Sequence, residues 1–485
     1  MLNCKTIFKI IGSLLFIESA MMVCCLIMSI AYHESDTIPF LCSILITFVS
    51  ALFLRFLGHK ADNSMTKRDA YLVVSLSWII FSFFGTFPLT IGEHVPSFTD
   101  AYFETMSGFT TTGATIINNV DILPHGILFW RSMTHWIGGL GIVFFTTAIL
   151  PSFVGGSVKI FAAESTGPIH SRLHPRLSTS AKWIWTVYLV ITIACSISFM
   201  VCGMGWFDSI NYAMGTTATG GFSTHNSSIA FFHSSAIEYV GAFFCFLSGI
   251  NFTLIYTSAI NKSIKTIFKS SEFRFYSFIT LIFSLFVIYQ LIKYNGYDIE
   301  HAIRSGIFQV VSFITTTGLF SDDANKWPHM TWIILTICMF LGACSGSTSG
   351  GFKSIRSVII IKMIKNEFKQ ILHPNAVLPI HVDGANITHQ KCVTLISFLS
   401  IYLLICLISV FIILLYGIDP MNSITMVLSS IGNVGPTIGR DIGATSSWVT
   451  LPTAIKWLCT ALMLIGRLEI FTVLVIFTPA FWKRN

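Results

Sequence analysis

Long apolar runs alternate with short polar segments along the whole chain. A helix needs about 20 mostly apolar residues to cross a bilayer, and ten runs meet that length. We place these spans at 7–30, 38–58, 71–92, 126–150, 183–204, 236–260, 275–293, 330–364, 393–416 and 452–478. The first run is too long for the apolar core of a signal peptide, and no small-residue cleavage site follows it. The pattern therefore predicts an all-α polytopic membrane protein.

Four shorter segments, each too short to cross a membrane, lie between pairs of long spans. Each ends in a stretch rich in threonine and glycine. The four segments are 97–109, 206–216, 300–314 and 420–431, and the stretches that follow them are Thr110–Gly113, Thr217–Gly220, Thr315–Gly318 and Gly432–Gly435. One such stretch could be a polar turn, but four copies at the same point of a repeating unit favour a shared function.

The repeat predicts the architecture. We expect four helix–pore helix–helix repeats around a central pore, preceded by two extra N-terminal transmembrane helices. The expected boundaries are 1–68 for the N-terminal pair, 69–181, 182–272, 273–390 and 391–485 for the four repeats, and 342–352 for an intramembrane loop in the third repeat. Glycines 113, 220, 318 and 435, spaced by 107, 98 and 117 residues, are taken as equivalent positions.

The threonine and glycine stretches suit a dehydrated monovalent cation. Non-helical backbone at membrane depth is tolerated where it lines a cavity, and backbone carbonyls there can replace an ion's hydration shell. Each short helix also directs the negative end of its dipole at the stretch, while Asp100, Asp208 and Asp419 lie near the opposite ends. The candidate ion-binding residues are Thr110, Thr111, Thr112, Gly113, Thr217, Ala218, Thr219, Gly220, Thr315, Thr316, Thr317, Gly318, Gly432, Asn433, Val434 and Gly435.

Composition and charge agree with a membrane protein and give it an orientation. Hydrophobic residues make up 53% of the chain and charged residues 11%, far from the usual balance of soluble domains. The net charge of +7 does not indicate nucleic-acid binding, because 22 of the 29 Lys and Arg residues fall at one set of alternate loops or the adjoining helix ends. This positive-inside bias predicts that both termini lie in the cytoplasm.

Two further features suggest a gate. "GACSGSTSGGFK" (342–353) interrupts a span with glycines and small polar residues. Its spacing does not match a phosphate-binding loop, so the open alternatives are helix packing through small residues and a movable loop whose candidate gate residues are Gly346, Gly350 and Gly351. Arg467 lies near the middle of the last span, where a charge should face the pore or a partner. Glu469 is a poor partner on the same helix, and a distant acid stays open.

Other polar residues in the spans are given structural roles. Arg131 is expected to extend its charged end to the outer interface. "HWIGGLGI" (135–142) is expected to open a closely packed helix, with His135 at a helix interface. The twelve cysteines include no CxxC pair and are expected to be structural thiols.

These motifs resemble the Trk/Ktr/HKT superfamily of potassium transporters, in particular its TrkH branch. The motifs are "TTTGAT" (110–115), "TATGGFST" (217–224), "TTTG" (315–318), "GNVGP" (432–436), "HWIGGLGI" (135–142), "GACSGSTSGGFKSIR" (342–356) and "GRLEIFTVLV" (466–475). The resemblance implies potassium uptake through the four strands and a homodimer in a bacterial inner membrane. It also implies a gating role for the 342–352 loop, and for Arg467 just below the filter. A TrkA-like cytoplasmic ring would be the regulator, so nucleotide (NAD or ATP) would act only through that separate chain. Asn433 and Val434 depart from the pattern, so we expect potassium to be preferred with sodium partly admitted.

Two other classes of function were weighed. A secondary transporter coupled to protons or sodium also uses broken helices, typically two breaks near the bilayer midplane. A membrane enzyme would need clustered catalytic side chains, and the fourteen histidines do not cluster in the sequence. We therefore expect a pore protein that is not an enzyme, with potassium as its substrate and no covalent cofactor.

Overall fold

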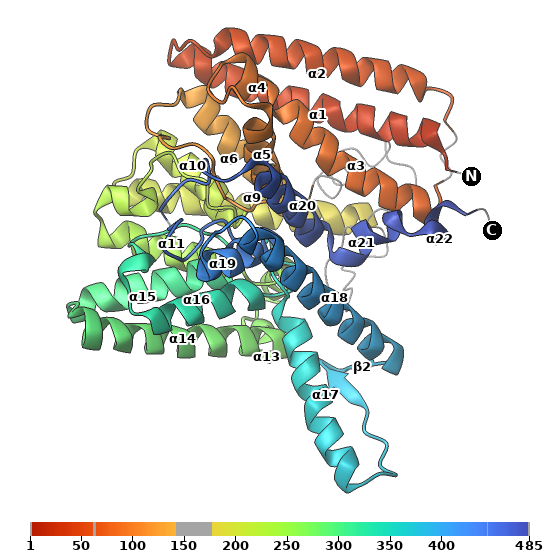
Figure 1. Cartoon of the computed structure of the whole chain (residues 1–485), viewed down its shortest axis with the longest axis vertical. Coiled ribbons are helices and arrows are strands. Elements are labelled where there is room, and N and C mark those ends of the chain that lie inside the picture. Colours follow the sequence, from red (N-terminus) through yellow and green to blue (C-terminus); the bar gives the residue numbers. More distant parts are fainter. Residues whose placement is uncertain (1, 62–64, 142–176, 444, 484–485) are drawn as a thin grey trace.

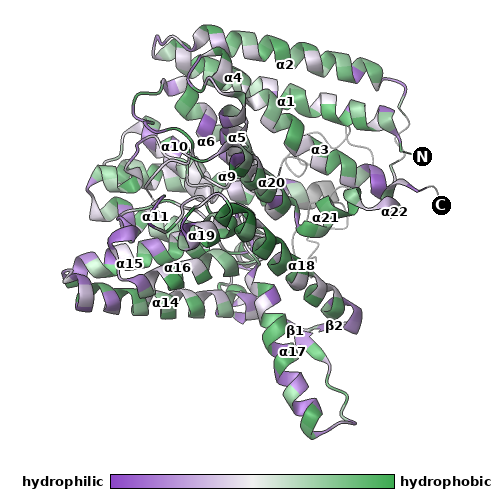
Figure 2. Cartoon of the chain, in the orientation of Figure 1, coloured by the Kyte–Doolittle hydropathy of each residue, from purple (hydrophilic) through white to green (hydrophobic). Residues whose placement is uncertain are grey.

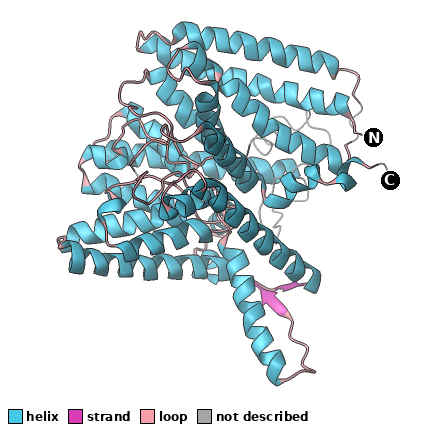
Figure 3. Cartoon of the chain, in the orientation of Figure 1, coloured by secondary structure: helices cyan, strands magenta, loops and turns pink. Residues whose placement is uncertain are grey.

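The computed structural model describes residues 2–61, 65–141, 177–443 and 445–483. Figure 3 shows helices throughout this part of the chain and one small hairpin. Its strands β1 (Ile380–Val382) and β2 (Ala385–Ile387) are antiparallel, with Ile380 opposite Ile387. Within the described residues, six helices are long and apolar enough to cross a membrane, or eight if each of two bent helix pairs counts as one span. The expectation of an all-α polytopic membrane protein is confirmed.

The first two helices form a pair at one edge of the molecule (Figure 1). α1 (Cys4–Ala31) and α2 (Thr37–Leu57) approach closely because Gly12 and Gly58 have no side chain. A Cβ on Gly12 would lie 2.9 Å from the carbonyl oxygen of Ala51, and one on Gly58 would lie 2.6 Å from the nitrogen of Lys9. Small residues permit this approach between membrane helices. The rest of α2 is largely apolar and exposed, as a lipid-facing helix should be (Figure 2).

Four units follow, each with a long helix, a short half-helix and a second helix. The first unit contains α3 (Lys67–Gly85), α4 (Phe87–Ile91), α5 (Phe98–Phe109) and α6 (His125–Leu140). The second contains α9 (Leu177–Val201), α10 (Trp206–Thr217), η1 (Ser228–Phe232), α11 (Ser235–Ser248), α12 (Phe252–Ile260) and α13 (Lys265–Lys269). The third contains α14 (Ser271–Asn295), α15 (Ile299–Ile314), η2 (Ala324–Lys326), α16 (His329–Leu341) and α17 (Ser354–Leu372). The fourth contains α18 (His389–Leu414), α19 (Pro420–Gly432), α20 (Thr453–Leu468), α21 (Ile470–Leu474), η3 (Val475–Phe477) and α22 (Pro479–Trp482).

Local sequence explains where several of these helices begin. A proline immediately precedes each of α6, α16 and α20: Pro124, Pro328 and Pro452. Proline has no backbone N–H, and a residue at the start of a helix does not need one. Asp419 caps α19 by accepting hydrogen bonds from the backbone nitrogens of Met421 and Asn422, at 3.0 and 3.4 Å. The acidic starts of the half-helices thus match the positive end of each helix dipole.

The second helices of the second and fourth units are broken, as is that of the third. The breaks expected in 330–364 separate α16 from α17. The expected span 236–260 is bent, because α11 and α12 meet at 91°. The expected span 452–478 is bent as well, because α20 and the segment Ile470–Phe477 meet at 113° around Glu469, whose φ is +63°. In the first unit α6 ends at Leu140, and the rest of the expected span 126–150 lies outside the described residues, as do Lys159, Arg172 and Arg176.

Both ends of the chain lie at the same end of the long helices (Figure 1). A hydrogen bond of 2.7 Å from Arg68 to the carbonyl of Lys483 joins the start of α3 to the C-terminal segment. α17 and the β1–β2 hairpin project away from the rest of the chain (Figure 1). The half-helices leave their C-terminal ends, and the threonine and glycine stretches, in the interior.

Candidate ion-conduction site

The four half-helices end in the same hydrogen-bond pattern. The backbone nitrogens of four residues each donate to a carbonyl five residues earlier: Thr112 to Ser107 at 2.9 Å, Gly220 to Gly215 at 2.9 Å, Thr317 to Ser312 at 2.8 Å and Val434 to Ser429 at 2.9 Å. The preceding residue donates to the carbonyl three before it in every case. These paired bonds form the Schellman motif, which closes a helix and turns the chain away from its axis. Each half-helix is therefore followed by a strand of the same geometry.

This pattern corrects the alignment of the second strand. Thr112, Gly220, Thr317 and Val434 occupy equivalent positions, so the residue equivalent to Gly113 is Gly221 and not Gly220. The φ angles agree: Gly113, Gly221, Gly318 and Gly435 have φ between +77° and +99°. Thr217 is therefore the last residue of the half-helix, and its carbonyl accepts a 3.0 Å hydrogen bond from the Thr348 hydroxyl. We call residues 110–113, 218–221, 315–318 and 432–435 the filter strands.

The second residue of every filter strand has a left-handed backbone. Thr111, Thr219, Thr316 and Asn433 have φ values of +54°, +53°, +57° and +54°. Asparagine tolerates this conformation, whereas a β-branched threonine adopts it at a cost of about 1–3 kcal/mol. Backbone strain of this kind concentrates at functional sites. Three of the four strands therefore hold a strained threonine at the same place.

The filter strands close into a ring through glycine. A Cβ built on any of the four glycines would collide with a carbonyl oxygen of the neighbouring strand: Gly113 with Gly220, Gly221 with Thr317, Gly318 with Val434, and Gly435 with Thr112. The order of contacts runs from the first strand to the fourth and back to the first. The four carbonyls belong to equivalent residues, and each lies at a junction between two neighbouring strands. A side chain at these glycines has no room without moving the oxygens.

The threonine hydroxyls are mostly used within the protein. Thr110 and Thr112 share a hydrogen bond of 2.8 Å, and Thr315 and Thr317 do the same. In the fourth strand, the Asn433 amide donates to the Thr112 hydroxyl at 3.0 Å and to the carbonyl of Met463 at 3.0 Å. Asn433 therefore ties the fourth strand to the first.

A hollow lies on one side of the ring and is lined by all four strands. Gly113, Gly221, Gly318 and Gly435 all contribute to its wall. On the other side lies the 342–352 loop. Gly350 donates from its backbone nitrogen to the Thr316 hydroxyl at 2.7 Å, and Gly351 packs against Gly342. The loop thus covers the side of the ring opposite the hollow.

Two contacts hold the loop to its surroundings. Glu272 of α14 accepts hydrogen bonds from the backbone nitrogen of Ser345 at 2.5 Å and from that of Ile355 at 3.1 Å. The carbonyl of Gly346 accepts a bond of 3.0 Å from Phe252, at the break between α11 and α12. The loop is therefore anchored at both ends and in its middle.

Arg467 lies between the loop and the first unit. Its guanidinium donates to the carbonyl of Thr348 at 3.1 Å and to those of Gly138 and Gly139, the latter at 2.6 Å. Glu469 instead pairs with Arg356 of α17 at 2.6 Å. The arginine's positive charge thus lies beside the loop and against three backbone carbonyls.

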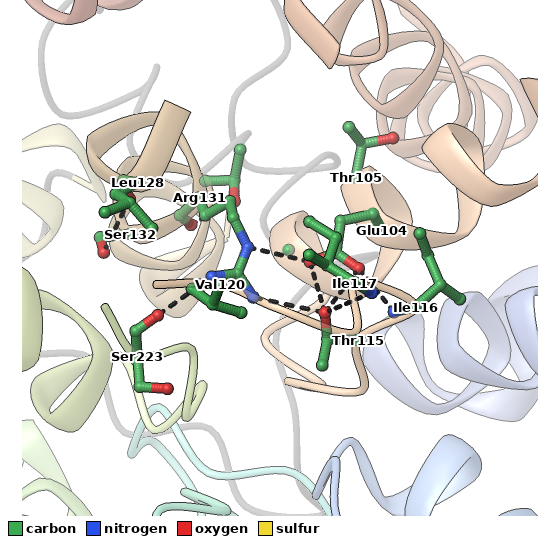
Figure 4. Close-up of polar contacts among 12 residues, drawn as sticks. Glu104, Thr105, Thr115, Ile116, Ile117, Val120, Leu128, Arg131, Ser132 and Ser223 are labelled. Carbon is green, nitrogen blue, oxygen red and sulfur yellow. Dashed lines mark hydrogen bonds and ion pairs between the residues drawn. The ribbon is translucent and has the colours of Figure 1, made fainter. Parts of the chain in front are cut away.

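Two residues behind the first strand differ from their sequence interpretation. Arg131 does not extend to the interface: it is buried and pairs with Glu104 at 2.9 Å (Figure 4). Sequence reasoning missed Glu104, although an acid within an apolar half-helix is itself a signal of a buried partner. "HWIGGL" closes α6 and does not open a helix, since α6 ends at Leu140. His135 lies at a helix interface as expected, and its Nδ1 lies 2.8 Å from the Gly108 carbonyl.

Ionic contacts join neighbouring units on the outer side of the ring. Lys456 of α20 pairs with Asp100 of α5 at 2.7 Å, and Arg304 of α15 pairs with Glu238 of α11 at 2.9 Å. Between the first two units, His225 lies 2.8 Å from Asp121 and 3.6 Å from Asp208.

These two carboxylates also set the protonation of His225. Partial burial alone would lower the pKa of His225, but the neighbouring carboxylates of Asp208 and Asp121 outweigh burial and raise it. Partial burial alone would raise the pKa of Asp208, but the nearby His225 and the hydrogen bond from Thr224 lower it.

Comparison with known proteins matches this chain over its whole length. Residues 39–484 match the family described as TrkH, cation transport protein. The Trk system potassium uptake protein TrkH of Halomonas elongata is 34% identical over 485 residues, covering 100% of both chains. The protein of the same name from Escherichia coli K12 is 34% identical over 99% of both chains. The crystal structure of the potassium transporter TrkH from Vibrio parahaemolyticus superposes with a TM-score of 0.89 at 33% identity, covering 99% of each chain.

Proposed function

The chain belongs to the TrkH family of cation transport proteins, and we propose that it takes up potassium ions across a bacterial inner membrane through the ring of filter strands. The carbonyls of Thr112, Gly220, Thr317 and Val434 carry this proposal, as one proposed layer of oxygens inside the ring. Four carbonyl oxygens at one level can replace part of the water shell of a monovalent cation. The C-terminal ends of four half-helices add negative potential at the same place.

Potassium is the proposed substrate, bound by Thr110–Gly113, Ala218–Gly221, Thr315–Gly318 and Gly432–Gly435. The relatives named potassium uptake proteins support this choice of ion. Because Asn433 and Val434 make the fourth strand differ in its side chains, we propose preference for potassium with partial admission of sodium.

The gate is proposed to be the 342–352 loop together with Arg467. The loop lies directly against the third filter strand through Gly350, and against the C-terminal end of α10 through Thr348. Arg467 adds a positive charge beside it, which opposes the passage of cations. Glu469 and Arg356 connect the same region to α17, so movement of α17 would reach the loop.

The regulator is proposed to be a separate cytoplasmic TrkA-like ring, which would supply any nucleotide response, and the chain is proposed to act as a homodimer. Both ends of the chain lie at one end of the helices, and the basic loops predict that this end faces the cytoplasm. α17 and the hairpin project from the chain and offer a surface for such a partner (Figure 1).

The second candidate is a secondary transporter coupled to protons or sodium. The bends of 91° and 113° favour it in part, because such transporters use broken helices. The four equivalent strands favour a pore, since rocking carriers build one site at the interface of two halves.

Single-channel recording of the purified protein in a bilayer distinguishes a pore from a coupled transporter. Discrete ohmic openings that reverse near the potassium equilibrium potential would support the pore. Flux that appears only with a gradient of protons or sodium would overturn it.

A further inference from the structure

A buried ion pair lies directly behind the first filter strand. Arg131 Nε and Glu104 Oε1 are 2.9 Å apart, and their side chains are 3% and 1% exposed (Figure 4). Glu104 belongs to the half-helix α5, and Arg131 belongs to α6. The pair therefore joins the two helices that flank the first strand.

Glu104 holds the outer end of that strand. Both of its oxygens lie 3.0 Å from the Thr115 hydroxyl, and Oε2 accepts a 2.9 Å bond from the backbone nitrogen of Ile116 (Figure 4). Thr115 comes two residues after Gly113. The strand is thus fixed at its inner end by the Schellman motif of α5 and at its outer end by a carboxylate of the same helix.

Arg131 extends this connection to the second strand. Its Nη1 donates to the carbonyl of Ser223 at 3.0 Å, and its guanidinium lies 4.1 Å from the centre of the Phe222 ring. Ser223 and Phe222 directly follow Gly221. Its Nη2 lies 3.4 Å from the Thr115 hydroxyl, so one side chain contacts the outer ends of both strands.

A buried ion pair is weak evidence for stability, because apolar residues of similar size often stabilise a protein as well. What the pair supplies here is fixed geometry: a planar fork with several donors in set directions. The other half-helices carry Tyr212, Gln309 and Met426 at the position of Glu104, six residues before the first residue of each filter strand. The acid occurs at this position in one unit of four.

We propose that Glu104 and Arg131 are positioning residues that set the spacing of the first and second filter strands, and thereby the preference for potassium over sodium. This proposal rests on the proposed function. The carbonyls of Thr112 and Gly220 are three residues from Thr115 and Ser223, so a shift of the outer ends reaches the oxygen layer. A layer of carbonyl oxygens whose spacing is less fixed would bind the smaller sodium ion more readily.

The test is the potassium-to-sodium permeability ratio, measured from reversal potentials of purified protein in a bilayer. The double variant Glu104→Gln/Arg131→Met removes both charges and leaves no unpaired buried ion. We expect its ratio to fall about tenfold, the effect of about one lost charge-assisted hydrogen bond at a site. Arg131→Lys keeps the charge but loses the fork, so its ratio should fall by a smaller factor.

A matched control separates positioning from general destabilisation. Asp100→Asn/Lys456→Met removes an ion pair between α5 and α20, in which Lys456 bonds Asp100 and the carbonyl of Val449 and not a filter strand. The control should keep the wild-type ratio, even if less folded protein is recovered.

Ratios within twofold of wild type in both Arg131 variants would overturn the proposal while leaving potassium uptake intact. If the double variant does not fold, the permeability ratio of Arg131→Lys alone tests the proposal. A wild-type protein without potassium preference would overturn the proposed function and the role of the pair together.

Discussion

Gly435 lies against the carbonyl of Thr112, so the fourth filter strand closes on the first. The two residues are 323 positions apart in the sequence and come from the last and the first unit. A chain with four tandem units has become a closed ring at this contact. The ring requires glycine at each junction, because a Cβ would occupy the position of the oxygen.

Substitution at such a junction should change selectivity. Gly113→Ser places a side chain against the carbonyl of Gly220, so we expect the potassium-to-sodium permeability ratio to fall about tenfold or more. Gly417→Ser is the matched control, because Gly417 has a φ of +80° with no atom within 4 Å of its added Cβ. Reversal potentials in mixed potassium and sodium measure both. An unchanged ratio in folded Gly113→Ser protein would remove this strand from the filter.

Replacing a strained threonine should raise the stability of the protein and lower its flux. Thr111 has a φ of +54°, and the fourth strand has Asn433 at the same position. Thr111→Asn should therefore raise the free energy of unfolding by about 1 kcal/mol, because asparagine tolerates the left-handed backbone. Thermal unfolding in detergent measures this gain, and flux measures the accompanying loss. A lower unfolding temperature would show that the Thr111 side chain stabilises the strand by more than the strain costs.

Arg467 should restrain flux in the resting state. Two unit charges about 4 Å apart interact by about 4 kcal/mol at an effective dielectric of 20, and about 1.4 kcal/mol changes a rate tenfold. Arg467→Ala should therefore raise resting potassium flux about tenfold or more. Arg467→Lys keeps the charge but cannot bond Thr348, Gly138 and Gly139 together, so it should leak less than the alanine variant.

Flux at matched membrane expression is the measurement for these variants. Arg274→Ala, which removes an exposed charge at the start of α14, is the control and should not leak. A folded Arg467→Ala protein with no rise in flux would mean that the arginine has only a structural role.

The outer contact of His225 with Asp121 and Asp208 should depend on pH. Folding raises the pKa of His225. The stability that this histidine contributes is therefore present below its ordinary pKa of 6.5 and is lost as pH rises through the raised pKa. Folding lowers the pKa of Asp208. The stability that this carboxylate contributes is therefore present above its ordinary pKa of 3.8 and is lost as pH falls through the lowered pKa.

The stability difference between wild type and His225→Gln should thus be largest between these limits and shrink toward pH 9. Unfolding temperatures across pH 5–9 measure it, with His329→Gln, at an exposed outer position, as the control. A difference that grows as pH rises would contradict the assigned direction.

The sequence predicted the four-unit plan because each half-helix leaves a local signal: a short apolar segment followed by threonine and glycine. It could not fix the register of the second strand, since Gly220 and Gly221 are adjacent and only the hydrogen bond from Gly220 to Gly215 distinguishes them. It also could not predict the bend at Glu469, because residues 470–477 that follow are as apolar as those of a continuous span.

Long-range contacts could not be predicted from the sequence either. Arg131 near a helix end is typical of a residue that reaches the interface, and only the fold brings Glu104 to within 2.9 Å of it. The sequence predicts that Arg467 needs a partner, but it could not identify the backbone carbonyls that the guanidinium contacts, which lie 119 to 329 positions away and carry no sequence signal.

The central claim is that a cation binds inside the ring of filter strands. The most direct measurement is the anomalous scattering of rubidium, which replaces potassium, in crystals of the purified protein. We expect a peak enclosed by the carbonyls of Thr112, Gly220, Thr317 and Val434, with a weaker peak in Gly113→Ser. Rubidium peaks elsewhere in the protein, with none inside the ring at a saturating concentration, would contradict it.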